Sequence, residues 1–220
     1  MKKMTFRHIV IPLLTLALIC FLYFGPITRT PFENIIISII IIIANYIEYK
    51  GKPFSALGFQ RDKFNAKNLL VHAPLVAFGL FILYVFAIVP GIEMLTGVPI
   101  DYSSMNQLKG NLSVTIVWVL IVWATAAFGE EIIFRGYLMR QFVKFFGDSK
   151  ISIVLNIVLV TGFFGLMHSQ QGITGQLVTW IIGALIALIF YLRKYDLWFV
   201  IAVHGFFNTI ALVCIYLGLA

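Results

Sequence analysis

The sequence predicts an all-α protein that crosses the membrane several times, a bundle of about seven transmembrane helices with a cytoplasmic N-terminus. Of the 220 residues, 61% are hydrophobic and only 11% are charged, whereas soluble domains carry about a quarter charged residues. Apolar runs of membrane-spanning length recur along the whole chain. They are continuous rather than alternating, which argues against a β-barrel. The composition therefore excludes a soluble domain, a disordered chain and a disulfide-rich secreted module.

Seven apolar segments can be drawn along the chain, and a helix of about 20 residues spans the hydrocarbon core of a bilayer. In order, the segments are Ile9–Phe24, Asn34–Tyr49, Leu69–Pro90, Leu112–Leu138, Ile151–His168, Ile173–Leu192 and Leu197–Leu219. The first two are short, and the fourth is long enough to continue into the cytoplasm as an amphipathic turn. We therefore expect a single membrane domain over residues 1–220, with the first three spans in residues 1–112.

The Lys and Arg residues alternate between the connections and so predict the orientation. The N-terminal segment holds three of them, the 50–68 connection holds five, and the connections after the fourth and sixth spans hold three and two. The other connections hold only Arg29 and Lys109. Because basic residues accumulate in cytoplasmic loops, the N-terminus is expected in the cytoplasm and the C-terminus outside. Basic residues confined to short connections between apolar runs indicate membrane topology rather than a nucleic-acid-binding surface. We therefore expect no nucleic-acid partner.

The 50–68 connection is the longest one on the cytoplasmic side, and it mixes basic residues with Phe54, Leu57, Phe59 and Phe64. An amphipathic helix lying on the anionic leaflet would explain this mixture. A plain linker that only sets the topology explains it equally well.

Ionisable side chains inside membrane spans are costly and therefore indicate functional sites. The first cluster is Glu130-Glu131-x-x-x-Arg135 in the fourth span. Adjacent helical residues point about 100° apart, and the i, i+4 spacing of Glu131 and Arg135 favours an ion pair. Glu130 is then left without a partner on another face, where desolvation suits a general base. The alternative is a structural network in which both acids are satisfied.

Two further pairs of residues that include polar side chains lie on later spans. Phe164 and His168 are one helical turn apart at the end of the fifth span, and His204 and Asn208 share one face of the seventh. A polar face inside lipid needs partners from another helix. Taken alone, His168 is typical of an interfacial residue, and His204 with Asn208 is typical of a structural hydrogen bond between helices.

Together, Glu130, His168, His204 and Asn208 come from three helices and suit the hydrolysis of an amide bond. The carboxylate can take a proton from water, and a histidine can assist it or protonate the leaving amine. The Asn amide and the other imidazole can donate to the developing oxyanion. No serine or cysteine in these clusters offers itself as the nucleophile.

These three motifs, in this order and on separate spans, resemble the CPBP family of intramembrane proteases, which includes the CAAX prenyl endopeptidases and the bacterial Abi proteins. The resemblance covers about 118–216 and makes residues 113–220 the catalytic core. It implies a membrane protease that cleaves a peptide bond near the cytoplasmic face.

The resemblance also implies a role for each motif residue. Glu130 would activate water with help from His168, and His204 and Asn208 would form the oxyanion site. The structural support would come from Glu131, Arg135 and Phe164.

No cofactor is expected, although two histidines and a carboxylate also form a familiar zinc set. Zinc held by Glu130, His168 and His204 therefore stays open. The pairing of Glu131 with Arg135 favours the metal-independent alternative, because a zinc-bound Glu130 would no longer be available as the base.

The implied substrate is a peptide or protein, which in this family can be lipid-modified, as in prenylated CAAX proteins. We expect bacteriocin or other peptide precursors, or the tails of membrane proteins, in a bacterial or archaeal plasma membrane. The oligomeric state stays open. Two other classes compete: a non-catalytic scaffold or immunity protein of the same fold, and a carrier with a proton relay. Seven spans without a repeat argue against the carrier.

One estimate conflicts with a shared site. With a rise of about 1.5 Å per residue, Glu130 and His204 lie roughly 10 to 15 Å from the cytoplasmic edge of the predicted spans, and His168 lies roughly 25 Å from it. Either the fifth span begins deeper than Ile151 or it tilts strongly.

Overall fold

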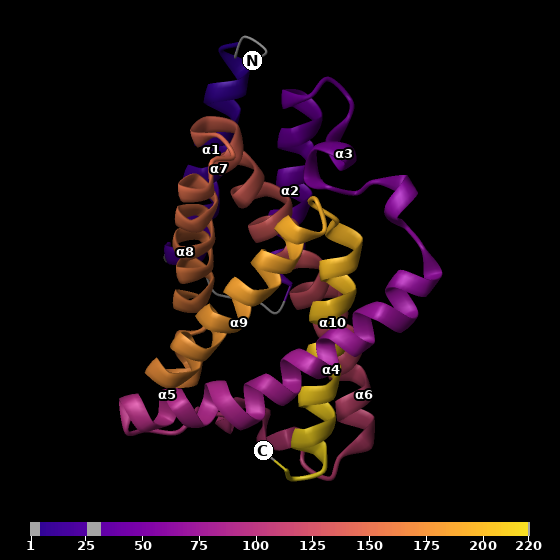
Figure 1. Ribbon diagram of the computed structural model, residues 1–220, viewed down its shortest axis with the longest axis vertical. Coiled ribbons are helices and arrows are strands. Elements are labelled where there is room, and N and C mark those ends of the chain that lie inside the picture. The colour runs from indigo at the N-terminus through magenta and orange to yellow at the C-terminus, as the bar shows by residue number, and fades with distance from the viewer. Residues whose placement is uncertain (1–4, 26–31, 220) are drawn as a thin grey trace.

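The computed structural model describes residues 5–25 and 32–219. These residues form helices and connecting turns and no strand, which confirms the all-α fold class. Figure 1 shows an elongated molecule with the N-terminus and α7 at one end and the C-terminus at the other. We call the first the basic end, because the helix starts at Arg7 and Lys150 lie there together with Lys144, which contacts His8 and Glu48, and we call the second the far end. Lys2, Lys3 and Arg29 of the charge pattern lie outside the described residues.

The α-helices are α1 (Arg7–Phe24), α2 (Glu33–Glu48), α3 (Pro53–Leu57), α4 (Ala73–Leu83), α5 (Val89–Thr96), α6 (Leu112–Val122), α7 (Arg140–Phe146), α8 (Lys150–Leu166), α9 (Gly172–Leu192) and α10 (Leu197–Tyr216). Short 3₁₀ segments are η1 (Arg61–Lys63), η4 (Ser103–Leu108) and η7 (Ser169–Gln171). Segments of π-helix are η2 (Asn68–His72), η3 (Tyr84–Ile88), η5 (Trp123–Glu130) and η6 (Ile132–Met139).

Five helices in the described residues are long and apolar enough to cross a membrane. They are Arg7–Phe24, Asn68–Thr96, Leu112–Phe146, Ser169–Leu192 and Leu197–Tyr216. The two remaining predicted spans are helical but shorter, with 16 residues in α2 and 17 in α8. At about 1.5 Å per residue they reach about 24 and 26 Å, less than a hydrocarbon core of about 30 Å. The count of seven spans therefore stays a prediction.

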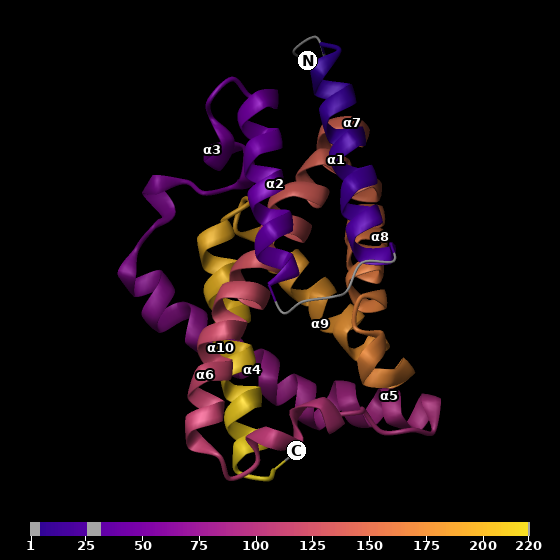
Figure 2. The ribbon, with the colours of Figure 1, turned by 180° about the vertical axis from the view of Figure 1, so that it is seen from behind.

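Two predicted spans end too early. The third continues through Pro90 to Thr96, because Pro90 stands in the first turn of α5, where the N–H that proline lacks is not needed. The fourth continues to Phe146 and forms one helix of 35 residues with two π-helical stretches. Figures 1 and 2 show this helix running from the far end to the basic end, with Asn68–Thr96 crossing α10 obliquely.

The 50–68 connection forms two short helices, α3 and η1, rather than one continuous amphipathic helix. Gly58 ends α3 at a φ of 101°, a conformation that favours glycine. Leu57 is fully buried, and the Phe59 ring lies 4.6 Å from that of Trp198. Lys63 donates to two main-chain carbonyls in the turn after α9. The connection therefore packs against the protein, as the linker alternative allows.

Helix α2 is attached to the long helix 112–146 at two places. Near the basic end, the fully buried carboxylate of Glu48 accepts from Lys144 at 2.7 Å and from Gln141 at 2.9 Å. Further along, the Ser38 hydroxyl donates to the Gly129 carbonyl at 3.1 Å. These contacts fix the position of α2 along the long helix and therefore place the residues at its start.

Lys144→Ala is expected to destabilise the protein, because it leaves the buried Glu48 carboxylate without its cation. Breaking a buried pair costs about 3–5 kcal/mol, and the 18% exposure of Lys144 reduces this to about 2 kcal/mol. The melting midpoint should fall by about 4–8 °C in a chain of this size. Thermal unfolding in detergent measures it, with Lys150→Ala, an exposed lysine, as the matched control. Equal midpoints for the two variants would contradict the attachment.

Candidate active site

The centre of the site is the predicted ion pair between Glu131 and Arg135. Their Oε1 and Nη1 atoms lie 3.0 Å apart, and both side chains are fully buried. The Arg135 guanidinium also donates to the Gly183 carbonyl of α9 at 2.7 Å and lies 5.0 Å from the centre of the Phe164 ring. The ion pair therefore connects the long helix to α8 and α9. It also links two residues one turn apart within the long helix itself.

Glu131 has a second partner that the sequence analysis missed. The Nδ1 atom of His204 lies 2.8 Å from Glu131 Oε1. Because an ionised carboxylate only accepts hydrogen bonds, Nδ1 carries the proton in this contact. The contact joins α10 to the long helix and turns the other ring nitrogen, Nε2, toward Glu130, whose Oε2 lies 3.9 Å away.

His168 is held in a similar way by a main-chain oxygen. Helix α8 ends at Leu166, so the Phe164 carbonyl is among the last four of the helix and has no partner within it. It accepts from His168 Nδ1 at 2.9 Å, and the two rings lie 4.7 Å apart. The spacing of the Phe164-x-x-x-His168 motif thus lets the histidine cap its own helix and leaves Nε2 available.

The two carboxylate oxygens of Glu130 have different surroundings. Oε1 accepts from the Asn34 amide at 3.1 Å, and Asn34 Oδ1 in turn accepts from the Tyr23 hydroxyl at 2.7 Å. Oε2 is buried and has no hydrogen-bond partner in the described part of the chain. Sequence analysis missed Asn34, because it begins an apolar run and serves there as a span boundary.

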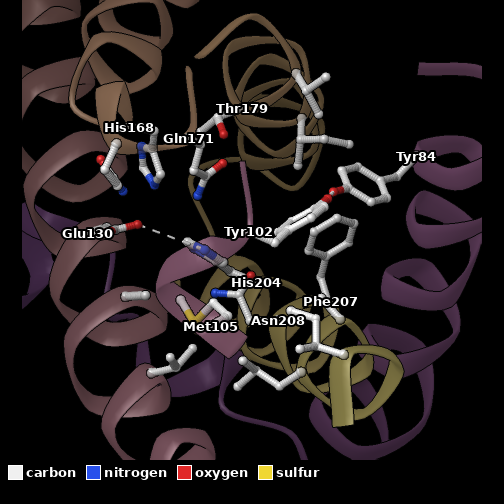
Figure 3. A pocket seen from close by; sticks show the side chains of 18 of the residues that line it. Tyr84, Tyr102, Met105, Glu130, His168, Gln171, Thr179, His204, Phe207 and Asn208 are labelled. Atoms are coloured by element: carbon white, nitrogen blue, oxygen red, sulfur yellow. Dashed lines mark hydrogen bonds and ion pairs between the residues drawn. The ribbon is translucent and has the colours of Figure 1, made fainter. Parts of the chain in front are cut away.

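All four predicted residues line one cavity of about 260 Å³. Figure 3 shows Glu130, His168, His204 and Asn208 around it, with Glu130 and His204 facing each other. The Asn208 amide makes no hydrogen bond to other described side chains or main-chain atoms, so it can donate into the cavity. Sequence analysis did not identify several other lining residues, among them Tyr84, Tyr102, Met105, Gln171 and Thr179. They lie on connections and apolar faces without a motif.

The long fourth helix explains how His168 and Glu130 share this cavity. Glu130 lies 16 residues before Phe146, or about 24 Å along the helix, and His168 lies 18 residues after Lys150, or about 27 Å. The two residues are therefore at similar distances from the α7–α8 turn. Figure 1 shows the α9–α10 turn closer to the middle of the molecule, which brings His204 to the same level after a shorter distance.

The side chains that the structure describes do not form an assembled set of zinc ligands. Within residues 5–25 and 32–219, no group of three or more His, Cys, Asp or Glu side chains is arranged to hold a metal ion. Glu130, His168 and His204 line the cavity together but do not form such a group.

The helical membrane-spanning fold thus places a carboxylate, two imidazoles and a carboxamide around one cavity, those of Glu130, His168, His204 and Asn208. Residues 112–210 match the family model described as type II CAAX prenyl endopeptidase Rce1-like. This range contains all three motifs, so the chain is similar to the CAAX endopeptidases in the part where the motifs predicted it. The chain is accordingly an integral, multi-pass membrane protein with a protease fold. No curated protein and no solved structure matches it.

Gly129→Ala is expected to destabilise the protein, because α2 passes too close to this position. A Cβ at Gly129 would lie 2.9 Å from Asn34 Cβ and 3.2 Å from its main chain. Overpacking of this kind costs about 1–3 kcal/mol, which is about 2–12 °C in the melting midpoint.

Gly91→Ala is the matched control, since nothing lies within 4 Å of a Cβ at that helical position. Thermal unfolding of the two variants in detergent compares them. A normal midpoint for Gly129→Ala would contradict the close approach of α2.

Proposed function

We propose that this chain is an intramembrane endopeptidase in which Glu130 activates a water molecule for attack on a peptide bond. The observation that carries the proposal is the asymmetry of the Glu130 carboxylate. One oxygen is held by Asn34, and the other is buried without a hydrogen-bond partner at the wall of a cavity, with His204 Nε2 3.9 Å away. A positioned carboxylate with one free oxygen next to space for water is what a general base requires.

The other residues suit the remaining steps. The water oxygen would attack the carbonyl carbon while Glu130 takes the water proton, with His168 Nε2 assisting. The tetrahedral oxyanion would accept hydrogen bonds from Asn208 and His204. The carbon–nitrogen bond would then break as the proton passes to the leaving amine, which gives a new carboxylic acid and a new amine.

The contact with Glu131 specifies the form in which His204 would act. Because Nδ1 donates to Glu131, a donor at Nε2 exists only when the ring carries both protons. The carboxylates of Glu131 and Glu130 lie on either side of the ring, at 2.8 Å from Nδ1 and 3.9 Å from Nε2. His204 would thus be the electrophilic group, and His168, whose Nδ1 donates to a neutral carbonyl, would be the proton-transfer group.

Glu130→Gln is expected to abolish cleavage of CAAX-type and random-sequence fluorogenic peptides by detergent-purified protein. Gln has the same shape and can still accept from Asn34, but it cannot take the water proton, so kcat should fall about 10²–10⁴-fold. Asp148→Asn, a carboxyl-to-amide change at an exposed turn residue, is the matched control and should keep full activity.

Each experiment is repeated with and without a strong chelator. Cleavage that is insensitive to the chelator supports a glutamate protease, whereas loss that zinc restores would assign Glu130, His168 and His204 to a metal. Full activity of Glu130→Gln would refute the proposal. In that case a scaffold or immunity function would be the better account of the intact motif.

Asn34→Leu is expected to lower kcat with little change in KM, because Asn34 orients Glu130 without facing the cavity. A misplacement of about 1 Å can cost about a hundredfold in rate. Tyr23→Phe removes only the hydroxyl that orients the Asn34 amide, so its effect on kcat should be smaller and in the same direction. Steady-state kinetics on the same peptides measures both, and unchanged kcat in Asn34→Leu would contradict the positioning role.

A further inference from the structure

The cavity has an exposed rim and a closed bottom. At the rim, Asp101, Ser104 and Gln170 line the cavity and are solvent-exposed. At the bottom, Ile186 is 1% exposed and His204 is 7% exposed, and the Glu130 side chain is 13% exposed. The cavity is therefore entered past the rim residues and ends at the candidate catalytic groups.

The rim belongs to the far end of the molecule. Its residues come from the 97–111 and 169–171 connections, which the Asp101 amide joins by donating to the Gln171 carbonyl at 3.1 Å. The Gly110 amide donates to the Tyr216 carbonyl at 3.0 Å, which attaches the first connection to the end of α10. Figures 1 and 2 show the end of α10 and the start of α6 together, opposite the N-terminus.

The basic residues lie on the other side of the closed bottom. The 50–68, 139–150 and 193–196 segments hold ten Lys and Arg residues, whereas 97–111 and 169–171 hold only Lys109. None of the described lining residues is a Lys or an Arg. Between the cavity and the basic end lies the buried layer around Glu131, Arg135 and Phe134, all at most 1% exposed. No residue of the basic segments is among the described residues that line the cavity.

We infer that the catalytic cavity opens on the non-cytoplasmic face of the membrane, so that substrates present their scissile bond from that side. The inference rests on the proposed function and on the rule that Lys and Arg accumulate in cytoplasmic connections. It departs from the cytoplasmic cleavage that the family resemblance implies. The substrate class is then the non-cytoplasmic segment of a membrane protein or of an exported peptide.

The charged residues that line the cavity restrict the substrate class further. Apart from the two histidines, its charged lining residues are Asp101 and Glu130, both acidic. The Ser103 hydroxyl and amide donate to Asp101, which lowers the pKa of its carboxyl, so the rim stays negative at neutral pH. Neutral or basic segments therefore suit such a rim better than acidic ones.

Cysteine labelling tests the side of the opening independently of any cleavage. In full-length protein carrying Cys20→Ala and Cys214→Ala, single reporters are placed at the rim (Ser104→Cys and Gln170→Cys) and at the basic end (Asp148→Cys). A membrane-impermeant maleimide is applied to intact cells, to inverted membrane vesicles and to detergent-solubilised protein. All three parent residues are exposed, so they form a matched set.

The expected result is labelling of the two rim reporters in intact cells and of Asp148→Cys only in inverted vesicles and detergent. The reverse pattern would overturn the inference, since the cavity would then open to the cytoplasm. Labelling of all reporters from one face, or rim reporters that stay unlabelled in detergent, would overturn it as well. If the labelling is as expected but active-site variants and wild type are equally inactive on every peptide, the proposed function fails and the orientation stands.

Discussion

The buried carboxylate of Glu131 is the interaction on which the site depends. It receives Arg135 from its own helix and His204 from α10. Arg135 then reaches the main chain of α9 and the Phe164 ring of α8. Four helices therefore meet at one ion pair. Because an unpaired charge in such a position costs several kcal/mol, a shift of any of these helices is penalised, and the cavity side chains stay in a fixed relation.

Close packing around this pair depends on a small residue in α9. A Cβ at Gly183 would lie 3.0 Å from the Phe164 ring and 3.4 Å from Arg135 Nη2. Glycine thus leaves room for the guanidinium to lie between a carbonyl and an aromatic face. The same Phe164 supplies the carbonyl that orients His168. The end of α8 thus couples the Glu131–Arg135 ion pair, the packing of Phe164 and the orientation of His168, a candidate catalytic residue.

The sequence was sufficient for features that depend on neighbouring residues. Apolar runs located the helices, and the i, i+4 spacing predicted the Glu131–Arg135 pair. It was insufficient where partners are far apart, as for Glu131 with His204 and Glu130 with Asn34. The length of the fourth apolar run indicated that its helix continues beyond Leu138, but its end at Phe146 was not located, because Arg140 and Lys144 interrupt the run although both are good helix formers. The π-helical stretches have no recognisable residue signal.

Asn34 lies outside residues 112–210, the part of the chain that the family model covers. The first and second helices therefore contribute to a centre whose motif residues all come from the second half. Two chains with identical motifs can then differ in turnover through the one amide at position 34. The motif residues are therefore necessary for the proposed site but do not describe all of it. A chimaera that exchanges the two halves of the chain must keep the residue at position 34 together with the glycine at position 129.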